Sequence, residues 1–234
     1  MSPPAVYDPD DQVPLFFIQN FRRYEKISRS GPKAPVGEFS VINDDDSKID
    51  NPFAVGRLRY PSIKSAIAES IYRIGFERNS DIVIGGTYAP VLQNIDSTQW
   101  TPNLIVFNSD LVVKSTPYLA QEMFGENLGN ILLKSTATNG TITHQSVKKG
   151  EEGDSKFGNL YFVATKRTND NTLIVKLASI DSNDIVVKIQ IQDSTTSSKG
   201  LAYILTAGPG VVSSTVHNTI SIPNAAPLLF NFIF

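Results

Sequence analysis

The chain has 234 residues, 41% of them hydrophobic, and a formal net charge of −2 at pH 7. This composition supports one large domain or two smaller ones, each with a real core, and it excludes a wholly disordered chain. The slight negative charge argues against nucleic acid or an anionic membrane as the main partner. No stretch approaches the roughly 18 consecutive apolar residues of a membrane span, and the N-terminal residues lack the basic and apolar regions of a secretory signal.

Cysteine is absent, and the two histidines, His144 and His217, lie in unrelated polar segments. Disulfides, thiolate metal sites and cysteine nucleophiles are therefore excluded, and we do not expect a histidine metal site or a Ser-His-Asp triad. The run Asp44, Asp45 and Asp46 lacks the alternating spacing and the glycine of a calcium loop, which favours a solvated turn. We therefore expect no metal site.

The first 129 residues alternate predicted helices and strands. Helices are expected over residues 14–26, 61–79 and 116–127, and strands over residues 33–41, 81–90 and 103–114, the last holding one or two short strands. The 61–79 helix is the clearest, because apolar residues recur along it with a spacing of 3.6. The apolar 81–90 strand is typical of a parallel sheet covered on both faces. Thr116 is the expected N-cap of the last helix, with Pro117 in its first turn.

After residue 130 the helical periods vanish. Predicted strands follow at intervals of roughly ten residues, over residues 159–168, 171–180, 184–191 and 201–208, as in an antiparallel sandwich. Within the second of them, Leu173, Val175 and Leu177 alternate with Thr172, Ile174 and Lys176. From pattern alone, the first part is either a small α/β domain or the last third of a βα barrel, since a whole barrel needs about 250 residues.

Glu38 follows the apolar part of the strand in GPKAPVGEFSVIND, residues 31–44. In a βα barrel the active site lies at the C-terminal ends of the strands, so Glu38 is a candidate catalytic residue; the alternative is a solvated rim glutamate. Gly37 would permit a close backbone approach or an unusual dihedral angle. Tyr88 ends the next apolar strand and either lines a pocket or caps the core. Trp100 either stacks on a sugar ring or anchors packing.

Four ordered segments resemble the C-terminal portion of glycoside hydrolase family 51, the α-L-arabinofuranosidases, most closely the fungal and plant branch. They are FRRYEKISRSGPKAPVGEF, AIAESIYRIGFERNSDIVIGGTYAPVLQNID, QWTPNLIVFNSDLVVKSTPYLAQEMFGENLG and LYFVATKRTNDNTLIVKLASIDSNDIVVKIQI. The first is similar to the family's run into its nucleophile strand, the second and third to its last barrel strands and helices, and the fourth to its C-terminal sandwich. The likeness covers most of Phe16 to about Pro223.

The resemblance implies an α/β plus all-β fold. Residues 1–129 would be the last strands and helices of a (β/α)8 barrel. Residues 130–234 would be an antiparallel, jelly-roll-like β-sandwich that is cut short at its end.

The implied activity is retaining hydrolysis of terminal non-reducing α-L-arabinofuranosyl residues in arabinan, arabinoxylan or related oligosaccharides. It needs no cofactor and takes place outside the cell. Glu38 corresponds to the nucleophile, and Phe39, Tyr88, Asn94 and Trp100 to substrate-binding positions. Family members are often homo-oligomeric.

Among the departures from the family pattern, two concern the catalytic residues directly. The acid/base glutamate belongs to an upstream Asn-Glu pair, and no such pair occurs in this sequence. Phe39 stands where the family usually has Trp or Tyr. We therefore expect little or no turnover from this chain alone, as from a fragment, with exposed apolar faces on the barrel strands and a sandwich that folds by itself.

Two alternatives remain open. One is a non-catalytic carbohydrate-binding sandwich that uses Tyr161, Phe162 and Tyr203. The other is a degenerate gene product without a role.

Overall fold

The computed structural model describes residues 20–25, 27–42, 57–97, 100–139, 142–145, 160–179, 187–189, 191, 199–205, 215–221 and 228–230. In the first part the elements are β1 (Ala34–Phe39), α2 (Ile63–Arg78), β2 (Val83–Tyr88), β3 (Leu92–Asn94), β4 (Ile105–Phe107), β5 (Val112–Lys114) and α3 (Thr116–Glu126). In the second part they are β6 (Ile131–Leu132), β7 (Thr136–Asn139), β8 (Ile142–Gln145), β9 (Leu160–Arg167), β10 (Thr172–Ser179), β11 (Val187–Ile189), β12 (Lys199–Leu205), β13 (Thr215–Ser221) and β14 (Leu228–Phe230). None of the helices in these residues is long and apolar enough to cross a membrane.

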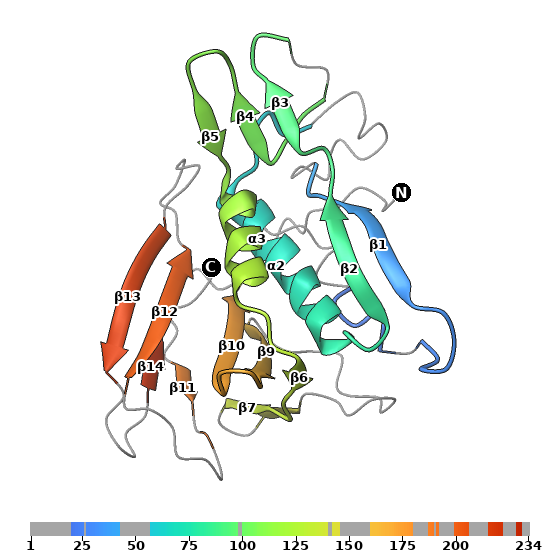
Figure 1. Ribbon diagram of the computed structural model, residues 1–234, viewed down its shortest axis with the longest axis vertical. Helices are drawn as coiled ribbons and strands as arrows, with labels where there is room; N and C mark the ends of the chain where they lie inside the picture. Colours follow the sequence, from blue (N-terminus) through green and yellow to red (C-terminus); the bar gives the residue numbers. More distant parts are fainter. Residues whose placement is uncertain are drawn as a thin grey trace.

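The strands β1 and β2 are parallel neighbours, and α2 connects them and covers one face of the pair (Figure 1). Both strands and the helix lie where the sequence predicts them. Ser62 is the N-cap of α2 and forms a capping box with Ser65, so Pro61 precedes the helix. A capping box satisfies backbone N–H groups that would otherwise lack acceptors in the first turn. The only described part of the predicted 14–26 helix is a turn at residues 20–25.

The β2 strand is covered on one face only, which corrects the expectation that both faces are buried. Val83 and Tyr88 are buried toward α2, whereas Ile84 is 66% exposed on the opposite face. The described residues place no second layer over Ile84, so its apolar surface meets solvent. This result confirms the expected exposure of apolar surface on the predicted barrel strands.

A three-stranded sheet of β3, β4 and β5 projects at the end of the molecule where β2 finishes (Figure 1). Its two strand pairs differ in direction, since β3 and β4 are parallel while β4 and β5 are antiparallel. The predicted 103–114 segment therefore holds two strands. Helix α3 begins at Thr116, and its N-cap is Ser115, whose Oγ accepts the Tyr118 N–H at 3.4 Å. The prediction of Thr116 as N-cap is wrong by one residue.

The second part of the chain consists of antiparallel strand pairs. They are β9 with β10, β6 with β9, β7 with β8, β11 with β14, and β12 with β13. The eight residues of β9 pair with the eight of β10 without a break in register. The predicted antiparallel arrangement is confirmed for these pairs.

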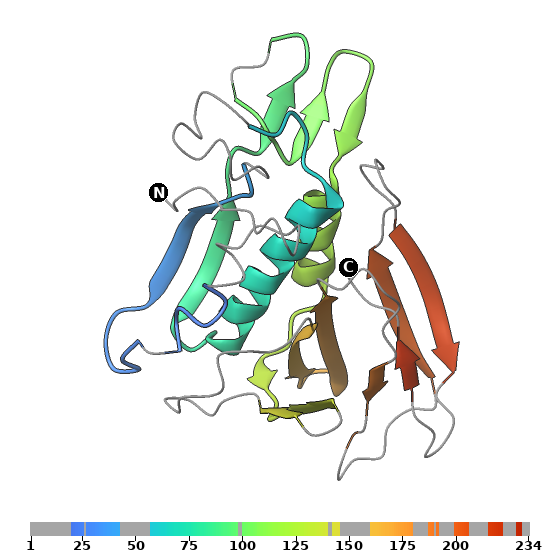
Figure 2. The same cartoon turned by 180° about the vertical axis from the view of Figure 1, so that it is seen from behind.

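The two parts share one hydrophobic core. Helices α2 and α3 lie between the β1–β2 pair and the strands β12 and β13 (Figure 1, Figure 2), and α2 also contacts β9 and β10. The rings of Phe21 and Tyr161 meet edge to face with centroids 5.2 Å apart. The predicted boundary between residues 129 and 130 falls between α3 and β6, and the core passes across it.

The alternating pattern predicted for β10 does not describe its burial. Ile174 and Lys176 are buried although they lie on the face that the alternation leaves outside, and Leu173 is only half-buried. The reason is that Lys176 faces α2 and α3. Its ammonium group forms an ion pair with Glu77 and donates to the Phe124 carbonyl oxygen at 3.3 Å.

Candidate active site at the ends of β1 and β2

The C-terminal ends of β1 and β2 lie side by side because the strands are parallel. Val36 pairs with Gly86 and Phe39 with Tyr88, so three steps along β1 match two along β2. One extra residue is therefore accommodated in β1, as in a β-bulge, a device that re-aims a side chain near functional sites. Val36 and Phe39 are buried toward α2, whereas Glu38 is exposed. The irregularity thus presents the carboxylate of Glu38 on the face opposite the helix.

The bulge is held from the neighbouring strand, where the Thr87 hydroxyl donates to the Gly37 carbonyl oxygen. Gly37 itself has no positive φ, and no described atom lies within 4 Å of a Cβ added to it. The expectation that Gly37 serves a close approach or an unusual dihedral angle is therefore wrong for the described residues. The glycine that packing does require is Gly86, since a Cβ there would lie 2.6 Å from Phe76 Cε2.

Phe39 and Tyr88 lie behind the site, inside the core. Phe39 is 1% exposed and its ring meets that of Tyr88 edge to face, with centroids 6.0 Å apart. The Phe39 ring also contacts the rings of Tyr72 and Phe76 of α2. These aromatic contacts anchor the two strand ends on the helix.

Beside this aromatic cluster lies a buried carboxyl group, that of Glu69. Its Oε1 accepts the backbone N–H of Val41 at 2.8 Å, three residues beyond Glu38. Burial raises the pKa of Glu69 to about 8, against the opposing effects of the Val41 hydrogen bond and of Arg73. Burial, and then Glu69, also raise the pKa of Tyr88 well above its ordinary value. Helical spacing alone does not reveal this contact, although a carboxylate amid the apolar residues of the predicted 61–79 helix was a usable signal.

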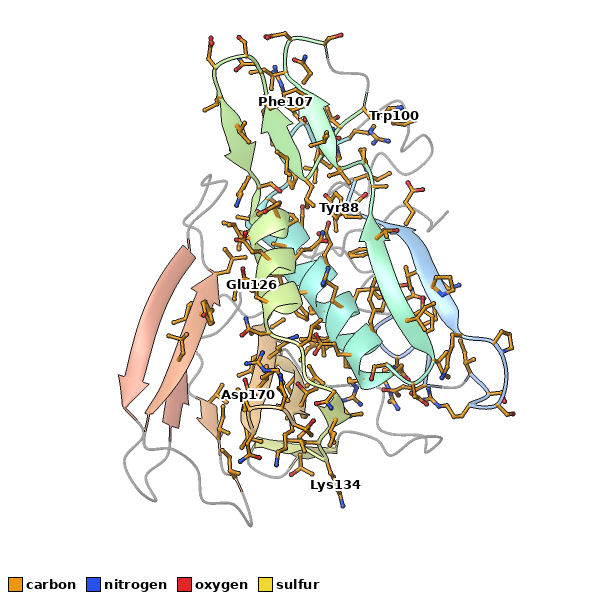
Figure 3. The ribbon with its side chains drawn as sticks, viewed as in Figure 1. Tyr88, Trp100, Phe107, Glu126, Lys134 and Asp170 are labelled. Atoms are coloured by element: carbon orange, nitrogen blue, oxygen red, sulfur yellow. The ribbon has the colours of Figure 1, made fainter. Side chains whose placement is uncertain are left out.

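Asn94 and Trp100 lie beyond the end of β2. The exposed Asn94 side chain accepts the Asp96 N–H at 3.0 Å and so shapes the turn after β3. Trp100 is 50% exposed, and the Arg57 guanidinium carbon lies 4.9 Å from its ring centroid. Figure 3 shows Trp100 and Tyr88 toward the same end of the molecule, where β2 finishes. Structure adds a buried amide pair that sequence reasoning missed, in which Asn103 Nδ2 lies 3.5 Å from Gln93 Oε1.

This arrangement suits carboxylate chemistry on the exposed face. A carboxylate held on a paired strand can attack an electrophilic carbon without the loss of freedom that a loop residue would suffer. Glu69 cannot be its solvent-facing partner, because α2 holds it on the other side of the sheet, where it is 2% exposed. In the part of the chain that the structure describes, no group of three or more His, Cys, Asp or Glu residues forms a candidate metal site.

Comparison with known proteins gives one consistent family. The model of the α-L-arabinofuranosidase C-terminal domain matches residues 37–227. The probable α-L-arabinofuranosidase A of Aspergillus flavus is 35% identical over 176 residues, which are 74% of this chain and 23% of the relative. The α-L-arabinofuranosidase A of Aspergillus kawachii is 36% identical over 169 residues, which are 68% of this chain and 24% of the relative.

A solved structure agrees with these matches. It is an arabinose-bound α-L-arabinofuranosidase of glycoside hydrolase family 51, with a TM-score of 0.72 and 29% identity, and the match covers 90% of this chain and 32% of that one. The chain thus spans about a quarter of the length of the two Aspergillus relatives. With the exposed strand-end glutamate and the antiparallel second part, these matches show that the chain belongs to the α-L-arabinofuranosidase C-terminal domain family, as a C-terminal portion of glycoside hydrolase family 51.

Proposed function

We propose that this chain forms the nucleophile side of a retaining α-L-arabinofuranosidase, with Glu38 as the nucleophile. In this proposal residues 1–129 supply the last strands and helices of a (β/α)8 barrel, and residues 130–234 form the sandwich that packs on them. One observation carries the proposal: the exposed carboxylate of Glu38 stands at the C-terminal end of a parallel strand, on the face opposite the covering helix. Barrel enzymes place their catalytic residues at that position.

The reaction follows from the carboxylate. A Glu38 oxygen attacks the anomeric carbon of an arabinofuranosyl residue while the bond to the leaving oxygen breaks, which gives a covalent ester. A second carboxyl group about 5–5.5 Å away protonates the leaving oxygen, then takes a proton from water as the water cleaves the ester. No Asn-Glu pair of the family type occurs among the 234 residues, so we infer that the acid/base comes from outside this sequence.

Terminal α-L-arabinofuranosyl residues of arabinan, arabinoxylan or related oligosaccharides are the proposed substrate. Support comes from the names of the relatives and from the bound arabinose of the similar solved structure. The exposed Trp100 ring offers a surface on which a sugar can stack,. Phe39 and Tyr88 are buried, so we propose that their rings support the strand ends that carry Glu38. Direct contact between these two rings and the sugar stays a prediction. Because such polymers lie outside cells, the proposed location is extracellular.

The alternative of a carbohydrate-binding sandwich finds less support. Tyr161 and Phe162 are 6% and 5% exposed, so two of its three candidate aromatic residues belong to the core. Only Tyr203 is partly accessible. A binding platform needs several solvent-facing rings, and no observation on the described strands favours one.

The proposal is tested with two aryl arabinofuranosides that differ in their leaving group. On the nitrophenyl glycoside, turnover by the purified chain should be very weak, because a missing general acid costs roughly 10²- to 10⁴-fold in rate. On the dinitrophenyl glycoside, whose leaving group needs no proton, the chain should release dinitrophenolate and accumulate an ester on Glu38, found by peptide mass spectrometry. Azide should speed the release.

Two variants complete this test. Glu38→Gln should abolish the ester and the azide effect, while Glu126→Gln, which alters an exposed glutamate at the end of α3, should leave both unchanged. Release that continues in Glu38→Gln would overturn the assignment of the nucleophile.

A further inference from the structure

The segment that follows Glu38 is fastened at three successive residues. The Phe39 carbonyl oxygen accepts the Ala89 N–H at 3.4 Å, and the Ser40 hydroxyl donates to the Ala89 carbonyl oxygen at 2.9 Å. The third fastening is the 2.8 Å hydrogen bond from the Val41 N–H to Glu69 Oε1. The first two bonds join Phe39 and Ser40 to Ala89, the residue after β2, and the third joins Val41 to α2.

Two buried polar atoms next to this segment have no hydrogen-bond partner in the structure. They are Glu69 Oε2 and the Tyr88 hydroxyl oxygen. The two side chains are 2% and 5% exposed, and Glu69 is, after burial, the second cause of the raised Tyr88 pKa. The structure shows no direct bond between these two atoms. Because an unpaired buried polar group is costly, one water between them would satisfy both.

We propose that Glu69 is a positioning residue for Glu38. Its carboxyl group ties the C-terminal ends of β1 and β2 together, because one oxygen accepts the Val41 N–H and the other reaches the Tyr88 hydroxyl through one water. Val41 lies two residues beyond β1, and Tyr88 is the last residue of β2. One side chain on α2 therefore fixes both strand ends behind the exposed glutamate. The contacts of Glu69 do not depend on the proposed function, and only the expected effect on catalysis rests on it.

The surroundings of Glu69 explain why a carboxyl group is tolerated there. The ionisable groups that face it are Arg73, one turn further along α2, and Tyr88 on β2. Burial favours the neutral form of Glu69. In both the neutral and the charged form, one carboxyl oxygen accepts from Val41 and the second oxygen remains available toward Tyr88. Glutamine has the same shape and the same acceptor, so Glu69→Gln should preserve the Val41 contact, whereas Glu69→Ala removes it.

The first test is amide hydrogen exchange of the full chain, followed by NMR. In Glu69→Ala the Val41 amide should exchange about tenfold faster or more, relative to the α2 amide of Ile71, since it loses a short bond to a carboxyl oxygen. In Glu69→Gln the Val41 amide should keep its protection. Glu77→Gln is the control, because it alters a half-buried glutamate of the same helix that bonds Lys176 and not Val41. Equal acceleration of Val41 in Glu69→Ala and Glu77→Gln would overturn the proposal.

The second test uses a variant that leaves Glu69 intact. Tyr88→Phe removes one hydroxyl from the core, and the pH midpoint of the Glu69 carboxyl carbon resonance should move upward, because the charged form loses a donor. An unchanged midpoint would overturn the bridge to Tyr88, even if Glu69→Ala does not fold. The control is Tyr118→Phe, which removes a hydroxyl that donates to Glu122 on α3. It should leave the Glu69 midpoint unchanged.

The catalytic consequence is measured separately. On the dinitrophenyl arabinofuranoside, Glu69→Ala should lower kcat with little change in KM, and Glu69→Gln should restore most of kcat. If Glu69→Ala frees the Val41 amide while Glu38→Gln leaves turnover intact, the positioning contact stands and the proposed nucleophile fails. If Glu38→Gln abolishes turnover while Glu69→Ala leaves both kcat and Val41 exchange unchanged, the positioning role fails alone.

Discussion

Two glutamates of α2 face the interior, the buried Glu69 and the half-buried Glu77, and they are compensated in different ways. Glu69 has a backbone N–H and Arg73 beside it, whereas Glu77 has the ammonium group of Lys176. Burial raises the pKa of Glu77 and lowers the pKa of Lys176, and the attraction between the two opposes both shifts. For Glu77 and Lys176 alike, burial is the largest effect on the pKa, and the partner across the ion pair opposes it.

The raised pKa of Glu69 predicts a pH-dependent stability. The folded protein holds this proton up to a pH of about 8, whereas the ordinary value is 4.5. The contribution of Glu69 is therefore complete below pH 4.5 and is lost as the pH rises toward 8. The loss has a slope of at most about 1.4 kcal/mol per pH unit. Urea unfolding across this range should show that Glu69→Gln flattens the decline, while the exposed-site variant Glu126→Gln retains it. Parallel curves for wild type and Glu69→Gln would contradict the prediction.

At the residue scale, sequence placed Glu38 correctly at an exposed strand end but missed both buried charges. Patterns of alternation and helical spacing treat a charged side chain as solvent-facing, because a lone buried charge is too costly. The partner that makes Lys176 tolerable, Glu77, is 99 residues away in the sequence. Nothing local to either residue reports that the two meet.

At the element scale, α2 packs unusually close to the backbone of β2. A Cβ added to Gly86 would lie 2.6 Å from Phe76 Cε2 and 3.2 Å from Phe39 Cε1. Both rings are buried and are themselves held by aromatic neighbours, so neither can move aside freely. The two glycines in the middle of β2 therefore differ, because a side chain at Gly86 would clash with the core whereas Gly85 faces open space.

This difference predicts opposite outcomes for two adjacent substitutions. Gly86→Ala should destabilise the protein by about 1–3 kcal/mol, because the new methyl group overpacks the contact with Phe76. Gly85→Ala should be neutral or slightly stabilising, because an alanine loses less conformational freedom on folding than glycine. Thermal unfolding followed by circular dichroism compares them directly. A destabilisation of Gly85→Ala as large as that of Gly86→Ala would refute the packing argument.

The sequence predicts those elements that are long enough to show helical spacing or strand alternation within their own residues. Strands β9 and β10 are eight residues long, and α2 is sixteen, so each spans several periods of its repeat. Strands β3 and β6 have three and two residues, too few for an alternation, and they exist because a neighbouring strand pairs with them. The N-cap of α3 was misplaced by one residue because Ser115 and Thr116 both offer a hydroxyl, and only tertiary geometry selects Ser115.

At the scale of the whole molecule, the helices and the antiparallel strands form one core. Residues from α2, α3, β9 and β10 belong to the same cluster of buried side chains. The Lys176 ammonium group also lies 4.6 Å from the Phe124 ring centroid, between the two parts. From this continuity we predict that the described strands of the second part unfold together with the first, whereas the sequence predicts a sandwich that folds alone.

A single probe tests that cooperativity. Trp100 is the only tryptophan and belongs to the first part, whereas Lys176 belongs to the second. Lys176→Met removes the ion-pair partner of the half-buried Glu77, which should cost at most about 3–5 kcal/mol,. If the core is continuous, the thermal midpoint reported by Trp100 fluorescence should fall together with the midpoint from circular dichroism. The double variant Glu77→Leu with Lys176→Met should recover most of the loss, because an apolar pair removes the unpaired charge. A Trp100 midpoint that stays in place while the strands melt earlier would show two independent folding units, and would restore the separate sandwich that the sequence predicts.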